Sequence, residues 1–189
     1  MSAQDSKLFV ISGPSGAGKG TLVTRVRERR SNLGLTVSAT TRAPRKGEVD
    51  GVNYFFLTRE EFDRRVANGE FVEWAEVHGN CYGTLVSEVT SKLASGASLI
   101  LEIDVQGALQ VKERFPEAVL IFIKPPSLEV LRERLVGRGT ETPETIELRM
   151  ANAAHELALA DRYDEVVVND DLDRATDELV RVLDMHERI

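Results

Sequence analysis

The chain has 189 residues, of which 42% are hydrophobic and 29% charged, which are the proportions of a one-domain globular protein and exclude a disordered chain. Its formal net charge of −7 excludes the overall basic surface of a nucleic-acid-binding protein, so any anionic ligand must be held by local donors. The single cysteine, Cys81, excludes an intramolecular disulfide, and no apolar run is long enough to cross a bilayer. We therefore expect a cytoplasmic protein with no nucleic-acid, membrane or obligatory protein partner.

Apolar strands and helical segments alternate along most of the chain. The first strand is expected over 7–12, and a glycine-rich turn separates it from a helix over 19–30. Continuous apolar strands of this kind are typical of a parallel sheet with helices on both faces, so the fold class is α/β. The later expected elements are strands at 98–105, 118–123 and 165–168 and helices at 106–114, 127–136, 143–161 and 173–187.

The segment 38–94 does not follow this alternation and is expected to form a small α+β insert. Residues 52–57 are typical of an antiparallel strand, and residues 71–78 alternate between apolar and polar as a half-buried strand should. Between them, Thr58 and Glu61 have the spacing of a capping box, which predicts the start of a short helix.

A second interruption, the polar stretch 137–142, is expected to form the tip of a short mobile lid. Thr142 as N-cap and Pro143 at the first helical position then begin a new helix. The chain is expected to be one folded unit with five consecutive parts. These are core at 1–37, the insert at 38–94, core at 95–136, the lid region at 137–150 and the C-terminal part of the core at 151–189.

Residues 13–19 match the pattern G-x-x-x-x-G-K between an apolar strand and a helix, which is the context that a phosphate-binding loop requires. The glycines let several backbone N–H groups point at one phosphate, the helix N-terminus adds partial positive charge, and Lys19 reaches the outer phosphates. The competing interpretation, a glycine-rich turn beside a solvated lysine, leaves the position of Lys19 unexplained. The loop comprises Gly13, Pro14, Ser15, Gly16, Ala17, Gly18, Lys19, Gly20 and Thr21.

One position of the loop departs from the usual pattern. The residue after the lysine is usually Ser or Thr, whose hydroxyl binds Mg²⁺, but here it is Gly20. Because this position has no hydroxyl, we expect Mg²⁺ to be held by water, nucleotide phosphates and carboxylates. The run G-K-G-T resembles the loop of adenylate kinases, which work with it.

Two arginines and two carboxylates are further candidates for binding a phosphorylated ligand. Arg42 and Arg45, with Pro44 between them, form a rigid pair of donors that suits a phosphate dianion, although a solvated basic loop explains them equally well. Glu102 and Asp104 are two apart on an expected strand, so they should share a face at its C-terminal end, where open α/β sheets bind ligands. Carboxylates buried there need donors or a metal, which favours a functional role.

The segment 40–54, T-T-R-x-P-R-x-G-E-x-x-G-x-x-Y, resembles the nucleotide-monophosphate segment of guanylate kinases. Matching blocks run in the family's order from residue 8 to about 173. The resemblance implies a P-loop fold with a GMP-binding insert and a lid, and phosphoryl transfer from ATP to GMP with Mg²⁺ as cofactor. The other blocks are F-V-E-W-A at 71–75, G-N-C-Y-G-T at 79–84, L-E-I-D-V-Q-G at 101–107, P-P-S at 125–127, G-R-G-T-E at 137–141 and V-N-D-D at 168–171.

The resemblance also implies roles for individual residues on the acceptor side, where GMP and dGMP are the candidate substrates. Asp104 would lie between the base and the metal and act through water, so no side chain is expected to bind the metal directly. Glu102 would belong to the same site, at a position where the family often has Asp. The guanine would be read by Ser38, Glu73 and Thr84, and the GMP phosphate would be held by Arg42, Arg45, Tyr54 and Tyr82.

On the donor side, the resemblance implies that Asn169 lies near the adenine of ATP. The loop residues 13–21 would hold the phosphates of ATP. The catalytic side chains around the transferring phosphoryl group would be Lys19, Arg45, Arg134, Arg138 and Arg149.

The chemistry of guanine agrees with the role of Glu73, because one carboxylate can accept hydrogen bonds from both N1–H and the exocyclic amine. Taken alone, Glu73 would more often be a surface charge. Two other functions stay open: a sibling kinase of similar fold acting on a sugar phosphate or another nucleotide, and a non-catalytic module that binds protein partners. Ser38, Glu73 and Thr84 argue against the first, and the intact Lys19 argues against the second.

Overall fold

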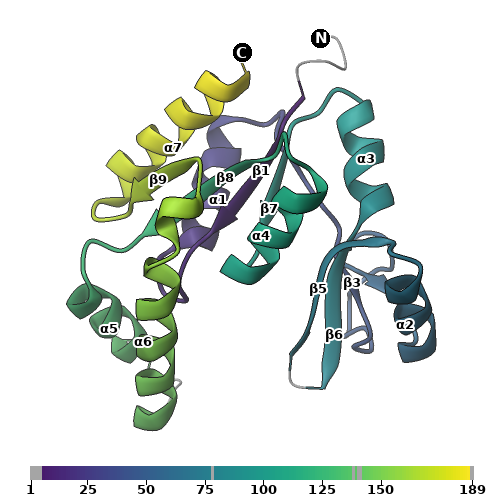
Figure 1. Cartoon of the computed structure of the whole chain (residues 1–189), viewed down its shortest axis with the longest axis horizontal. Helices are drawn as coiled ribbons and strands as arrows, with labels where there is room; N and C mark the ends of the chain where they lie inside the picture. The colour runs from purple at the N-terminus through teal and green to yellow at the C-terminus, as the bar shows by residue number, and fades with distance from the viewer. Residues whose placement is uncertain (1–5, 78, 138, 140–141, 188–189) are drawn as a thin grey trace.

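A computed structural model describes residues 6–77, 79–137, 139 and 142–187 (Figure 1). A five-stranded parallel sheet, in the order β2-β7-β1-β8-β9, lies between two layers of helices, which confirms the α/β fold class. The two-residue β2 was not among the expected strands, because so short a strand shows no periodicity. The strands are β1 (Leu8–Ser12), β2 (Gly34–Leu35), β7 (Leu99–Glu102), β8 (Val119–Lys124) and β9 (Glu165–Val168).

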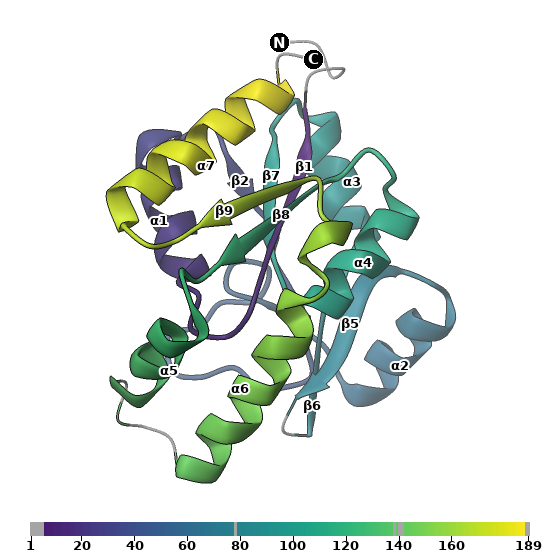
Figure 2. The same cartoon turned by 60° about the vertical axis from the view of Figure 1, so that its left-hand side comes forward.

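Each face of this sheet is covered by its own helices, because successive side chains of a strand point to opposite faces. Helices α1 and α7 pack on the face that carries Phe9, and α3 and α4 pack on the face that carries Leu8. Figure 2 shows α1 and α7 together on one side of the sheet. No helix within the described ranges is long and apolar enough to span a membrane. The bounds are α1 (Lys19–Arg29), α3 (Val86–Ala94), α4 (Val105–Arg114) and α7 (Leu172–Glu187).

Ion pairs join α1 to α7 along their length. The guanidinium of Arg30, directly after α1, contacts the carboxylates of Asp184, at 2.9 Å, and Glu187. The side chains of Arg30 and Glu187 are only 13% and 16% exposed, whereas those of Arg25 and its partner Asp173 are 43% and 74% exposed. The Arg30 pair is therefore the one that is shielded from water. A further pair joins Arg29 and Asp177.

The insert is built on a second sheet, in the order β4-β3-β6-β5, together with helix α2 (Arg59–Ala67). Its small core contains Phe62, Phe71 and Cys81. Helix α2 begins as expected, because the Thr58 hydroxyl accepts a 3.1 Å hydrogen bond from the Glu61 N–H. The strands are β3 (Ala39–Thr40), β4 (Phe55–Phe56), β5 (Phe71–Val77) and β6 (Asn80–Leu85).

The antiparallel strand expected at 52–57 was wrong in both length and direction. Only β4 is a strand, and it runs parallel to β3. The preceding residues form a turn instead: Gly51 has a φ of 74°, and the Asp50 carboxylate accepts a 2.8 Å hydrogen bond from the Phe56 N–H. The loop between β3 and β4 thus returns the chain to the start of β3 before pairing begins, so both strands run in the same direction.

The strand expected at 98–105 is shorter, and Asp104 does not share a strand face with Glu102. Strand β7 ends at Glu102. Asp104 is the N-cap of α4, where its carboxylate accepts a 2.7 Å hydrogen bond from the Gly107 N–H. A capping aspartate satisfies a helical donor that would otherwise have no partner, so capping outweighs the apolar alternation of residues 99–103.

Helices α5 (Leu128–Gly137) and α6 (Pro143–Leu157) form a helical arm, packed through Leu131, Leu135 and Ala153. Helix α6 begins at Pro143 behind the N-cap Thr142, as expected, but it ends at Leu157, and a 3₁₀ turn (Ala160–Arg162) follows. The arm and the insert extend from the same end of the parallel sheet, on either side of α4 (Figures 1 and 2).

Two contacts between side chains and backbone join the insert to the core. The guanidinium of Arg114, the last residue of α4, donates to the carbonyl oxygens of Gly69 and Phe71 at the start of β5. The carboxylate of Glu88, on α3, accepts a 2.9 Å hydrogen bond from the N–H of Val37, two residues before β3. The first contact therefore falls on the body of the insert, where β5 begins, and the second on the segment that leads into the insert.

Candidate active site

The phosphate loop lies between β1 and α1, as its sequence predicts. Gly13 has a φ of 143°, and a Cβ there would lie 2.3 Å from the carbonyl oxygen of Ile123, so only glycine fits. Gly18, the N-cap of α1, has a φ of 92°. The first turn of α1 holds no acidic side chain, which leaves its N-terminal N–H groups available to an anion.

Lys19 bends back over the loop that precedes it. Its ammonium group donates hydrogen bonds to the carbonyl oxygens of Gly13, at 2.5 Å, and Pro14, at 3.1 Å. The positive charge is therefore held beside the loop. This is the position that a charge needs if it is to act on the outer phosphates of a nucleotide.

Asn169 and Arg134 hold the loop from the outside. The Asn169 side-chain amide donates a 2.8 Å hydrogen bond to the carbonyl oxygen of Ala17, and Asn169 is only 5% exposed. The Arg134 guanidinium donates to the Asn169 carbonyl at 2.8 Å and to the Ala17 carbonyl at 3.5 Å. Sequence reasoning missed this clamp, because backbone carbonyls carry no sequence signal.

The helical arm also contacts the loop directly. The guanidinium of Arg149, on α6, donates a 2.5 Å hydrogen bond to the hydroxyl of Ser15. Arg134 and Arg149 are thus both brought to the loop, although they come from different helices of the arm. Arg138, the third arginine expected here, lies outside the described residues.

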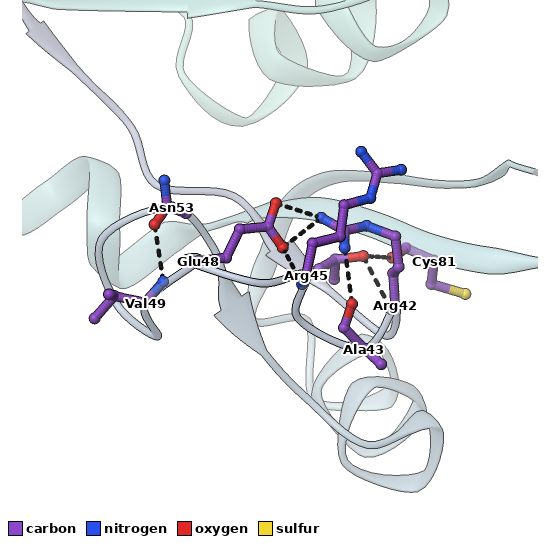
Figure 3. Close-up of polar contacts among 8 residues, drawn as sticks. Arg42, Ala43, Arg45, Glu48, Val49, Asn53 and Cys81 are labelled. Atoms are coloured by element: carbon purple, nitrogen blue, oxygen red, sulfur yellow. Dashed lines mark hydrogen bonds and ion pairs between the residues drawn. The ribbon is translucent and has the colours of Figure 1, made fainter.

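The arginine pair of the insert is arranged by a glutamate to which sequence reasoning gave no role (Figure 3). Both carboxylate oxygens of Glu48 accept hydrogen bonds from the Arg42 guanidinium, at 2.9 and 3.0 Å, and one also accepts from the Arg45 backbone N–H at 2.7 Å. The Arg42 guanidinium lowers the pKa of Glu48. Figure 3 shows the Arg45 guanidinium directed away from Glu48, so the hydrogen bond fixes the backbone of Arg45, while the charge of Arg45 also helps to lower the pKa of Glu48.

Two tyrosines stand beside this arginine pair. The Arg42 guanidinium carbon lies 5.4 Å from the centre of the Tyr54 ring, and the Tyr54 ring lies 6.3 Å from the Tyr82 ring, edge to face. The four residues expected to hold a phosphate therefore lie in one region of the insert, although β6, which carries Tyr82, is distant in sequence from the loop that carries Arg42.

Glu73 and Thr84 face each other across β5 and β6, which pair in antiparallel register. The Thr84 hydroxyl donates a 2.8 Å hydrogen bond to one Glu73 carboxylate oxygen. Burial raises the pKa of Glu73, the Thr84 hydroxyl opposes that shift, and the charge of Asp104 adds to it. A Cβ at Gly107 would lie 3.5 Å from Glu73 Oε2 and 3.4 Å from Asp104 Oδ1, so both carboxylates lie at the first turn of α4.

A pocket of ≈ 450 Å³ connects the two halves of the site. Gly20 and Glu102 line it from the core, and Ser38 and Tyr54 line it from the insert. Packing around the Glu102 carboxylate raises its pKa, and the nearby charge of Lys19 acts in the opposite direction. The pocket thus joins the phosphate loop to the segment that carries the arginine pair.

A glycine-rich loop on the parallel sheet and an arginine pair on a separate insert, joined by one pocket, place the chain among the P-loop kinases that phosphorylate nucleoside monophosphates. The sequence model of guanylate kinases matches residues 5–186. The chain belongs to the guanylate kinase family. It is therefore an enzyme, a phosphotransferase, and its substrates are ATP and GMP.

Individual relatives agree with this assignment. A guanylate kinase of Gloeobacter violaceus is 57% identical over 178 residues, which are 94% of this chain and 87% of that protein. One of Halalkalibacterium halodurans is 52% identical over 183 residues, 97% of this chain and 90% of its own. The crystal structure of guanylate kinase from Anaplasma phagocytophilum superposes with a TM-score of 0.72 at 37% identity, covering 96% of this chain and 86% of that one. Neither a sibling kinase nor a non-catalytic module is favoured by these comparisons.

Proposed function

We propose that ATP and GMP meet in the pocket between the phosphate loop and the insert. The observation that carries this proposal is the shared lining of that pocket, with Gly20 and Glu102 on the donor side and Ser38 and Tyr54 on the acceptor side. In this arrangement residues 13–21 hold the phosphates of ATP, and Asn169 orders the loop from behind. GMP is held by Arg42, Arg45, Tyr54 and Tyr82 at its phosphate and by Ser38, Glu73 and Thr84 at its base.

The chemistry needs no strong general base, because the GMP phosphate is already an anionic nucleophile. Catalysis then consists of positioning and charge stabilisation. Lys19 and Arg149 supply positive charge at the loop, where their contacts with Pro14 and Ser15 already direct them. Arg134 adds a third charge, and the family resemblance assigns the same task to Arg138. Exclusion of water by the arm would suppress ATP hydrolysis.

The residues present also fit a magnesium ion. Gly20 offers no hydroxyl, but a Cβ placed there would have the two carboxylate oxygens of Glu102 at 3.7 and 3.8 Å as its nearest described neighbours outside the adjoining residues and the backbone of its own helix. Carboxylate oxygens are the hard ligands that Mg²⁺ prefers, and the ion usually keeps several of its waters. Glu102 would hold the ion and its waters beside Gly20, and Asp104, two residues further along, would act through water. When bound, Mg²⁺ neutralises phosphate charge and orients the phosphates.

Two moving parts accompany this proposal: the insert at 38–94 and the lid region at 137–150, each attached to a core made of 1–37, 95–136 and 151–189. The separate sheet and separate core of the insert support such a division, with β5 resting on α4 as the place where the insert meets the core.

A coupled assay of ADP formation tests the acceptor assignment. GMP, dGMP, AMP, UMP and ribose 5-phosphate are supplied in turn with ATP and Mg²⁺. We expect GMP to give the highest kcat/KM, with AMP and UMP lower by orders of magnitude. Comparable rates with AMP, or a preference for the sugar phosphate, would overturn the assignment of Glu73 and Thr84.

A further inference from the structure

We propose that Gly20 and Glu102 are a matched pair, in which the Glu102 carboxylate supplies the protein oxygen that a Ser or Thr hydroxyl at position 20 supplies in other phosphate loops. The inference deepens the proposed function, because it says which side chain of this chain faces Mg²⁺ and why that side chain is a glutamate. The two positions at which the chain departs from the usual residues, 20 and 102, are neighbours in space.

The geometry beside Gly20 defines the space that the missing hydroxyl would have used. Gly20 is the second residue of α1, and Glu102 is the last residue of β7, which pairs with β1 so that Glu102 lies opposite Ile11. A Cβ at Gly20 would be in ordinary van der Waals contact with the Glu102 carboxylate oxygens, at 3.7 and 3.8 Å. The carboxylate therefore borders the space that a side chain at position 20 would enter.

The length of the glutamate side chain decides whether this arrangement works. An aspartate at 102 would have its carboxylate about 1.5 Å closer to the backbone, the length of one carbon–carbon bond. The oxygens would then withdraw from the space beside Gly20, and position 20 itself has no hydroxyl to replace them. A glycine at 20 thus calls for the longer acid at 102, whereas a serine at 20 would make the shorter acid sufficient.

The Glu102 carboxylate is also not used in another described interaction. Within the described part of the chain it accepts no hydrogen bond and forms no ion pair, and it lines the ≈ 450 Å³ pocket between loop and insert. Asp104, by contrast, uses one carboxylate oxygen to cap α4. Lys19 is the charged group whose field acts on Glu102. An uncommitted carboxylate in a pocket beside a cationic loop is available to an ion that arrives with the nucleotide.

Manganese binding tests the pair without relying on turnover. Electron paramagnetic resonance measures the affinity of Mn²⁺ for the full-length chain in the presence of GMP and a non-hydrolysable ATP analogue. The key variants are Glu102→Asp alone, Gly20→Ser with Glu102→Asp, and Gly20→Ala with Glu102→Asp. The alanine variant is the matched control, because it fills the space beside position 102 but brings no oxygen.

We expect Glu102→Asp to weaken Mn²⁺ binding about 10-fold or more. Adding Gly20→Ser should restore the affinity to within about 3-fold of the parent, as a replaced oxygen ligand should, whereas adding Gly20→Ala should not restore it. Gly20→Ser alone should change the affinity little. Glu102→Gln, which keeps the length of the side chain and removes its charge, should also weaken binding.

The pairing is wrong if Glu102→Asp binds Mn²⁺ like the parent, or if alanine at 20 restores binding as well as serine does. Thermal unfolding of each variant separates loss of the ligand from loss of the fold. Failure of the proposed function is distinguishable: the parent chain would then bind Mn²⁺ with ATP but would not prefer GMP in the acceptor assay.

Discussion

The hydroxyl of Thr84 donates a 2.8 Å hydrogen bond to the carboxylate of Glu73, so that the carboxylate is oriented before any base arrives. The bond crosses two antiparallel strands and holds one oxygen of a buried acid. The other oxygen lies near Gly107, at the first turn of α4. A carboxylate fixed in this way can accept both donors of guanine side by side.

Glu73→Gln should therefore raise the KM for GMP and narrow the GMP-to-AMP ratio of kcat/KM. Adenine presents an acceptor where guanine presents N1–H, and a paired base contact is worth roughly 1–3 kcal/mol of discrimination. Steady-state kinetics with both nucleotides measure the ratio. Glu76→Gln, on the same strand but paired with Arg59, is the control and should leave the ratio unchanged. If the ratio of Glu73→Gln also stays at the parent value, the base is read elsewhere.

On acidification, GMP binding should begin to weaken at a higher pH than it would if Glu73 had the ordinary pKa of a glutamate. Burial raises the pKa of Glu73, so its protonated form accumulates where an exposed glutamate is still ionised. The same shift favours folding below the ordinary pKa of glutamate, and this contribution is lost as pH rises through the raised folded pKa. As the pH is lowered, the KM for GMP should begin to rise at a higher pH in the parent than in Glu73→Gln. Superimposable profiles for both proteins would contradict the assignment.

Lys19→Met should remove most of the activity and leave the fold intact. Removing a charge that faces the transferring phosphoryl group should lower kcat roughly 10²–10³-fold. The variant also loses the two hydrogen bonds to Gly13 and Pro14, so a small decrease in the midpoint of thermal unfolding should accompany it. Rates and circular dichroism are measured together. A variant that retains the parent kcat would show that the loop does not serve ATP.

The ion pairs between α1 and α7 should contribute unequally to stability. Arg30→Met leaves Glu187 shielded from water without its partner, so it should lower the free energy of unfolding by about 2–3 kcal/mol. Arg25→Met, at the exposed end, should lower it by less than about 1 kcal/mol. Urea unfolding at low and high salt measures both. Equal losses for the two variants would show that shielding does not govern these pairs.

Addition of GMP with a non-hydrolysable ATP analogue should make the protein more compact. The insert and the arm extend from the same end of the sheet, so their approach over bound nucleotides should decrease the radius of gyration. Small-angle scattering with each nucleotide alone and with both measures the change. Identical curves with and without both nucleotides would exclude this closure.

The phosphate loop could be predicted from sequence because its spacing, its flanking strand and its glycines all reflect one backbone shape. The strands of the parallel sheet could also be predicted, since burial on both faces makes them continuously apolar. Strand β2 and the direction of β4 could not, because two residues carry no periodicity and the direction depends on the loop before them. The spacing of Glu102 and Asp104 is that of a strand face and therefore predicts a strand, although Asp104 is the N-cap of α4.

Most of the candidate site residues could be named from the family resemblance, but their local partners could not. Glu48 became visible only when the loop folded it back onto Arg42. The clamp of Asn169 and Arg134 on Ala17 brings together residues far apart in sequence, and it acts on carbonyl oxygens that every residue possesses. Contacts of this kind follow from tertiary structure and leave no pattern in the sequence.

Arg114 also contacts backbone carbonyl oxygens, because its guanidinium holds the insert through those of Gly69 and Phe71. At Phe71 this contact uses only the carbonyl oxygen, whereas at Gly69, whose φ is 68°, an added Cβ would lie 3.4 Å from the Arg114 guanidinium. Together with the packing of Val72 against the core, this contact fixes where β5 lies on α4, so exposed side chains of the insert can change without moving the strand.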